Sequence, residues 1–184
     1  MKKNKTRKFQ KLRTGFIFLL LFFIFFIFIY VLLGYSFLYN HINYFFGIAS
    51  NFIINHLFGI VTIFSYDVIN HLSVITISSI DYPIYISFLC TGILEFALLA
   101  SAILASSNAS WKKRGIGAAL AVLVVIIFNL IRISFTVYLI TVLNLPWATF
   151  FHSFLFRLFL VIIVLGFYWF WLRRSTGRLR IKKK

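Results

Sequence analysis

Four long apolar stretches restrict what this chain can fold into more than any other feature. They cover residues 16–38, 89–106, 115–142 and 151–172. A helix that crosses the roughly 30 Å hydrocarbon core of a bilayer needs about 20 apolar residues, and each stretch approaches or exceeds that length. With 62% hydrophobic residues, the chain is also far more apolar than soluble proteins. The sequence therefore predicts an all-α integral membrane protein.

The basic residues indicate how these helices are oriented. All but two of the 19 lysines and arginines lie in residues 1–13, in the segment 111–115 or in the tail 173–184. Each group flanks an apolar stretch, which is the positive-inside pattern of a multi-pass protein in the cytoplasmic membrane of a cell. We therefore expect both termini and the 107–114 loop to be cytoplasmic.

A net charge of +16 can also indicate a nucleic-acid partner. Here the cations are confined to segments that flank apolar helices, and no folded basic face is predicted, so we exclude nucleic acid and expect membrane lipid as the partner. The first apolar run is longer than a signal peptide's and no small-residue cleavage site follows it, so we expect an uncleaved first span.

Residues 39–88 lie between a first span that leaves the cytoplasm and a second predicted span that returns to it. This region must therefore cross the membrane an even number of times. Residues 45–66 are apolar enough for a span, but they contain Asn51 and Asn55 and have no flanking cations. They favour a helix on or partly in the outer face. A crossing followed by a return crossing is the alternative, so the chain has about four to six spans.

The stretch 71–88 alternates β-branched and polar residues around a Ser-Ser-Ile-Asp-Tyr-Pro break. This pattern predicts a short extracytoplasmic β-hairpin that leads into Cys90. No internal repeat or linker divides the chain, so we expect one transmembrane domain, 1–184. Its parts are a cytoplasmic basic tail (1–15), a first span (16–38), an extracytoplasmic or interfacial region (39–88), a three-helix core (89–172) and a second basic tail (173–184).

Three polar side chains lie at similar depth on three different predicted helices. Counted from the cytoplasmic ends at 1.5 Å per residue, Cys90, Arg132 and His152 lie about 24, 26 and 30 Å up. A thiol becomes a strong nucleophile as the thiolate, which a nearby cation favours, and a histidine can carry the proton. The coincidence in depth therefore favours a catalytic group in the outer half of the membrane.

Each of these residues also has a structural interpretation. A lone Cys90 would be a small inert hydrophobe, Arg132 would extend to the outer head groups, and His152 would cap a helix or fill an interface. Glu95 and Arg157, counted at about 17 and 23 Å, could form a buried ion pair that joins two of the helices.

The motifs CTGILE (90–95), NLIRI (129–133) and HSFLFR (152–157) lie in this order on three successive predicted spans. Together they resemble the exosortase and archaeosortase family of integral membrane transpeptidases. The family pattern is a Cys followed by a small hydroxylated residue and Gly, then Asn-x-x-Arg, then a His or Arg at the start of the last helix. The resemblance covers roughly residues 45–172 and is to compact, Gram-positive-like members.

The resemblance implies that Cys90 is the nucleophile, Arg132 its electrostatic partner and His152 the acid and base. The expected enzyme is a cysteine transpeptidase or protease that cleaves C-terminal sorting signals through a thioacyl intermediate. Its partner would be a secreted client protein that ends in a short motif, a hydrophobic helix and a basic tail. The active site would face outside, and an amine or water would accept the acyl group.

Further residues of the motifs are expected to bind substrate or support catalysis. Asn129 lies one turn before the predicted catalytic arginine on the same face and could orient it. Thr91 stands where the family usually has Ser, and Gly92 would let a substrate backbone approach the thiol. Glu95 and Arg157 complete this set, and Arg157 is the alternative to the histidine as third catalytic residue.

The sequence shows no metal-ligand cluster, phosphate-binding loop or cofactor motif, so we expect no metal and no cofactor. The single cysteine excludes an internal disulfide. A non-enzymatic membrane protein, such as a transport or assembly factor whose polar residues hold helices together, is the alternative function. The two alternatives differ in what they require at Cys90. A transpeptidase needs the thiol, whereas a protein in which Cys90 only packs would tolerate Ser or Ala there.

Overall fold

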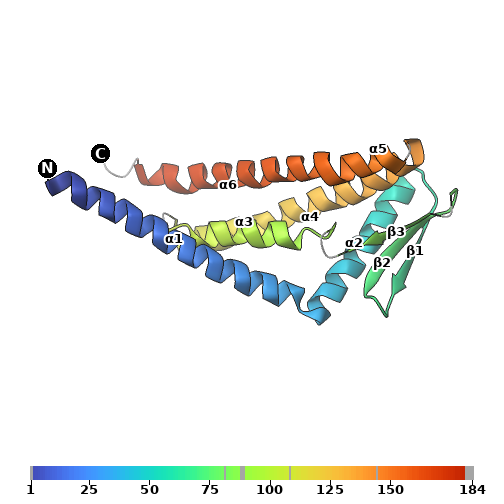
Figure 1. Ribbon diagram of the computed structural model, residues 1–184, viewed down its shortest axis with the longest axis horizontal. Coiled ribbons are helices and arrows are strands. Elements are labelled where there is room, and N and C mark those ends of the chain that lie inside the picture. The colour runs from blue at the N-terminus through green and yellow to red at the C-terminus, as the bar shows by residue number, and fades with distance from the viewer. Residues whose placement is uncertain (1, 81, 88–89, 108, 144, 181–184) are drawn as a thin grey trace.

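The computed structural model describes residues 2–80, 82–87, 90–107, 109–143 and 145–180 (Figure 1). In chain order the elements are α1 (Lys2–Gly34), α2 (Ser36–Leu57), β1 (Thr62–Asp67), β2 (Leu72–Ile77), β3 (Tyr82–Ile86), α3 (Ile93–Ala105), α4 (Trp111–Val142), α5 (Leu145–Phe150), a π-helical turn (Phe151–Leu155) and α6 (Phe156–Arg180).

The long helices α1, α4 and α6 run along the long axis of the molecule, with α3 among them (Figure 1). Both ends of the described chain lie at one end of this bundle, and α2, α5 and the sheet lie at the other. The start of α4 lies beside the end of α6, where Lys113 Nζ donates a hydrogen bond to the Ser175 carbonyl at 2.8 Å. The three basic segments predicted to share one side of the membrane are therefore gathered toward one end.

Three helical segments of the described chain are long and apolar enough to cross a membrane: Leu12–Gly34, Trp111–Val142 and Pro146–Ser175. The expected range of four to six spans is not confirmed. The predicted span 89–106 is the 13-residue helix α3, which is only about 20 Å long. It packs against α1, α4 and α6, so much of its apolar surface contacts protein.

The small sheet is a meander of antiparallel strands in the order β1-β2-β3. Strands β2 and β3 form the hairpin predicted for residues 71–88. The chain is mostly helical with a hairpin, as expected, but the sheet has a further strand, β1. The expectation of one helix over 45–66 is wrong, because α2 ends at Leu57 and β1 follows it. Gly59 has a φ of +66°, which L side chains rarely adopt, and the chain changes from helix to strand there.

The asparagines of α2 hold this sheet. Asn51 Oδ1 accepts a hydrogen bond from Thr62 Oγ1, and Asn55 Oδ1 accepts one from the Thr62 backbone N–H, both at 2.9 Å. Asn43 Nδ2 donates to the His71 carbonyl at 2.9 Å, just before β2. The polar residues that argued against a membrane span in this region therefore bind strand backbone and side chains.

A cluster of buried aliphatic side chains joins the sheet to α2 and α4. Ile75, Ile77 and Ile86 of the sheet pack with Ile133 and Val137 of α4. Phe46 and Ile54 supply the α2 side of the same cluster. This contact fixes the end of β3, and the segment that follows it, relative to the middle of α4.

Arg114, at the start of α4, closes the connection from α3. Its Nε donates to the Ala109 carbonyl at 2.9 Å and its Nη1 to the Leu104 carbonyl at 3.0 Å, while its guanidinium lies 4.5 Å from the ring centre of Trp111. The side chain is buried. This arginine therefore satisfies one carbonyl at the end of α3 and one in the connection that follows it.

We expect Arg114→Lys to lower the free energy of unfolding by about 1–3 kcal/mol, because one ammonium group cannot reach both carbonyls as the guanidinium does. Arg173→Lys is the matched control, since Arg173 lies 4.1 Å from the Trp169 ring centre but is exposed. It should change stability by no more than about 0.5 kcal/mol. Unfolding of the purified proteins in detergent measures both, and equal effects would contradict the role of Arg114.

Candidate active site

Cys90 lies in the connection between the sheet and the helical core. It follows β3 and precedes α3, and its side chain is half-buried. The Cys90 N–H donates to the Ser87 carbonyl at 2.9 Å, and the Ser87 hydroxyl lies 3.5 Å from the Cys90 sulfur. The hairpin and the start of α3 therefore position the thiol together.

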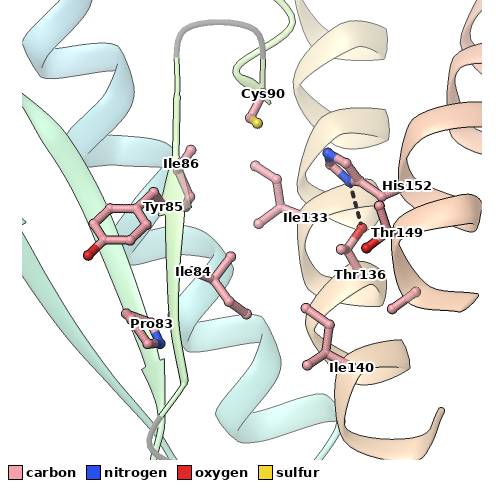
Figure 2. Close-up of a pocket in the computed structure, with 11 residues that line it drawn as sticks. Pro83, Ile84, Tyr85, Ile86, Cys90, Ile133, Thr136, Ile140, Thr149 and His152 are labelled. Carbon is pink, nitrogen blue, oxygen red and sulfur yellow. Dashed lines mark hydrogen bonds between the residues drawn. The ribbon is translucent and has the colours of Figure 1, made fainter. Parts of the chain in front are cut away.

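Cys90 and His152 line the same cavity, which has a volume of about 300 Å³. Figure 2 shows both side chains directed into the space between β3 and α4. The rest of the lining comes from β3, from α4 and from the segment α5, and it carries no charged side chain; it consists of Pro83, Ile84, Tyr85, Ile86, Ile133, Thr136, Ile140, Ala148 and Thr149. The structure thus brings two of the three predicted catalytic residues to one cavity.

The hydrogen bonds around His152 define its tautomer. Thr136 Oγ1 donates its single proton to the Arg132 carbonyl at 2.7 Å. It also lies 3.1 Å from His152 Nδ1, where it can only accept, so Nδ1 carries the imidazole proton. Nε2 of His152 is then left with its lone pair, and Figure 2 shows this nitrogen on the side of the ring nearer Cys90.

Arg132 reaches the site through His152. The arginine is buried, and its Nη2 donates a hydrogen bond to His152 Nε2 at 3.5 Å, while its Nε has no hydrogen-bond partner. Because the guanidinium is permanently charged, a second positive charge on the adjacent imidazole is unfavourable. The arrangement therefore favours an uncharged His152 that can accept a proton, with a cation beside it.

Asn129 and Gly92 have roles other than those expected for them. Asn129 is buried and donates to the carbonyl of Val125, one turn earlier, so it does not orient the arginine. Gly92 has a φ of +75°, and a Cβ there would overlap the Asn129 side chain. The missing side chain thus permits close packing of α3 on α4, where an approaching substrate was expected. Thr91 is buried beside it.

The expected ion pair between Glu95 and Arg157 is not formed between these two described residues. Arg157 is exposed, and Oε2 of Glu95 is buried without a hydrogen-bond partner. Of the two candidates in HSFLFR, His152 lines the cavity and Arg157 does not. His152 lies in the π-helical turn Phe151–Leu155, a geometry that is frequent at functional sites.

Sequence reasoning missed Thr136 and Ser87 as parts of the site. Thr136 lies four residues after Arg132, which places both on one face of a helix. That spacing was a usable signal, although hydroxyl residues at such spacing are common in membrane helices. Ser87 was missed because its contacts with Cys90 depend on how the backbone leaves β3, and no residue pattern predicts that path.

Comparison with protein-family models, with curated proteins and with solved structures found no match. What the site can do is therefore argued from its own residues. A thiol, an imidazole with an unprotonated ring nitrogen and a neighbouring guanidinium can carry out nucleophilic acyl transfer. Among the described residues, no group of histidine, cysteine and acidic side chains is arranged to hold a metal ion.

We expect Thr136→Val to slow alkylation of Cys90 by iodoacetamide at neutral pH by about fivefold, the effect of losing one hydrogen bond of ordinary strength. Without the acceptor at Nδ1, the imidazole loses the bond that keeps the proton on Nδ1 and holds the unprotonated Nε2 on the side of the thiol. Thr136→Ser should restore the wild-type rate and its pH profile.

Thr141→Val is the matched control, because Thr141 donates a similar bond to the Tyr138 carbonyl on the same helix, at 2.7 Å. Mass spectrometry of the intact protein measures the rate, since the chain has one cysteine. Equal rates for Thr136→Val and Thr141→Val would show that Thr136 does not position the histidine.

Proposed function

We propose that the protein is a membrane-embedded cysteine transpeptidase or protease that cleaves C-terminal sorting signals of secreted proteins. The supporting observation is that Cys90 and His152, from distant parts of the chain, line one cavity while Arg132 contacts the histidine. The resemblance of the three motifs to the exosortase and archaeosortase family points to the same chemistry.

In the proposed reaction, His152 Nε2 gives up its hydrogen bond from Arg132 and takes the proton of the Cys90 thiol. The thiolate attacks a client peptide carbonyl, and the negative charge on the tetrahedral oxygen is stabilised by the nearby Arg132 guanidinium. The protonated imidazole then gives its proton to the leaving amine as the C–N bond breaks, which leaves a thioester on Cys90. A second amine or water attacks the thioester and frees the thiol.

The position of the cavity suits a client with a three-part C-terminal signal. The cavity lies toward the sheet end of the molecule, and the basic segments lie toward the other. A client helix that crosses the membrane with its basic tail in the cytoplasm would carry its preceding motif to the sheet side. We therefore place the sheet and the cavity at the outer face of the cytoplasmic membrane.

A non-enzymatic membrane protein is the second candidate, since polar residues clearly hold parts of this fold. Arg114 and Asn55 are of that kind, and their polar groups bond to backbone groups nearby. The thiol of Cys90 faces a cavity, and Arg132 has a buried nitrogen without a partner. This difference favours the enzyme.

We expect Cys90→Ala to abolish client processing and His152→Ala to lower it by about 100-fold or more, because each removes a reacting group. Arg157→Ala is the control from the same motif and should retain processing. The measurement compares the C-termini of secreted proteins, by mass spectrometry, in cells that make each variant.

Membrane abundance of each variant is measured in the same cells. A client still processed by Cys90→Ala would remove the enzyme hypothesis. If Arg157→Ala were abundant but inactive and His152→Ala fully active, Arg157 would be the third catalytic residue.

The proposed topology predicts that the turn between β1 and β2 is outside the cell. In a Cys90→Ala background, Ile69→Cys should react with a membrane-impermeant maleimide on intact cells, since Ile69 is 89% exposed. Lys112→Cys, also at an exposed position, should react only after the cells are opened. The reverse pattern would place the cavity on the cytoplasmic side.

A further inference from the structure

Strand β3 borders the cavity with its backbone. Four successive residues, Pro83 to Ile86, line the cavity. Figure 2 shows Ile84 directed toward α4 and Tyr85 directed away from it, so Tyr85 meets the cavity with backbone atoms, as it does where a cavity reaches the strand's edge. β3 is the last strand of the sheet in the part of the chain that the structure describes, and such an edge carries unpaired N–H and C=O groups.

The register shows which backbone groups face this edge. Ser78 N–H donates to the Val61 carbonyl at 3.1 Å, one step beyond the Thr62–Ile77 pair. Hydrogen-bonded pairs alternate along an antiparallel ladder, so the even-numbered residues of β2 bond to β1 and the odd-numbered ones to β3.

The odd-numbered residues of β2 pair with Tyr82, Ile84 and Ile86, whose backbone groups are therefore used within the sheet. Pro83 and Tyr85 turn theirs to the free edge. Proline is tolerated in a sheet where its missing N–H faces outward, which agrees with this assignment. The free edge thus offers two carbonyls and, between Tyr82 and Ile86, a single N–H, that of Tyr85.

We propose that the client segment containing the scissile bond binds as a fourth strand on the free edge of β3, paired with the backbone of Tyr85. This inference rests on the proposed function, and it names how that function's substrate is held. The edge leads directly toward Cys90, so a peptide along it carries its carbonyls past the thiol. Recognition is then largely of backbone, as in other cases of strand addition.

The walls of the cavity fit an extended peptide. Side chains of an added strand alternate, and those on one side meet the apolar Ile84 of β3 and Ile133 and Ile140 of α4. A helix with its side chains is about 10–12 Å across. One turn of such a helix needs more space than a cavity of about 300 Å³ offers. The uncharged lining also predicts that the client residues next to the scissile bond are uncharged.

The single cysteine allows a test that needs no knowledge of the client. The probe is the peptide Ac-Val-Thr-Ala-chloromethyl ketone, which alkylates a thiol after binding as an extended chain; iodoacetamide reports the reactivity of the thiol alone. Rates are measured on the full chain in detergent, by intact mass, for wild type, Tyr85→Pro and Tyr85→Ala. Tyr85→Pro removes the edge N–H, and Tyr85→Ala removes only the side chain.

We expect Tyr85→Pro to lower the peptide rate at least about fivefold, with the iodoacetamide rate unchanged, and Tyr85→Ala to have less effect. Probes N-methylated at Val, Thr or Ala in turn test the same bonds from the peptide side on wild-type protein. At least one should react at least about fivefold more slowly than the parent. If Tyr85→Pro does not fold, the N-methylated probes alone test whether backbone hydrogen bonds hold the peptide.

Equal peptide rates for Tyr85→Pro and Tyr85→Ala, with no loss from any N-methylation, would overturn the edge proposal. That result is also expected if a lipid chain or another ligand without backbone amides is the true occupant. The proposed function fails by a different result, namely secreted C-termini that are the same with wild type and Cys90→Ala.

Discussion

The packing of the sheet on α4 is the contact on which the candidate site depends. Ile86 at the end of β3 is buried against the cluster that contains Ile133 and Val137 of α4. Those two residues are the immediate neighbours of Arg132 and Thr136 in the sequence. The same contact that buries the sheet therefore sets the segment after β3, with its thiol, opposite the part of α4 that holds the histidine. Loosening this core would separate the reacting groups before it unfolded the long helices.

The polar groups buried in this apolar chain fall into two sets. Arg114 and the α2 asparagines 51 and 55 bond to backbone or side chains nearby, which is how buried polar groups normally contribute to a fold. By contrast, several buried polar atoms have no hydrogen-bond partner; they include Arg132 Nε and Glu95 Oε2, and also Asn43 Oδ1 and Ser50 Oγ of α2. Unpaired buried groups are costly, and native proteins keep them mainly where function requires them. Among them, Arg132 Nε belongs to a side chain that contacts His152, so a charged group with an unused donor lies beside a residue of the cavity.

Counting helical rise from the basic ends predicted that Cys90, Arg132 and His152 lie at similar depth. In the structure Cys90 and His152 line one cavity and Arg132 contacts His152, although α3 is not a full span. The count succeeded because the rise per residue is nearly constant in any helix, whatever its length. The hairpin over 71–88 was also recognisable, from alternation and a turn signal. Strand β1 was missed because the apolar run 57–64 leads from the end of α2 into it, and pairing with β2 is what distinguishes the strand. The tautomer of His152 depends on one proton of Thr136, which no sequence pattern reports.

The shortness of α3 has a consequence for how substrate reaches the thiol. With α1, α4 and α6 as the spanning helices, the chain must return from the sheet end to the basic end through α3 and the segments that flank it. A 13-residue helix falls about 10 Å short of the roughly 30 Å hydrocarbon core. Arg114 holds the C-terminal end of α3 against the start of α4. The missing helix length therefore lies mainly at the N-terminal end of α3, next to Cys90. In the proposed topology, Cys90 is then recessed below the outer surface, and β3 is the element that extends from that surface toward it. A peptide that follows the edge of β3 can enter this recess with its backbone amides paired, which a peptide without a strand partner could do only by burying them unpaired.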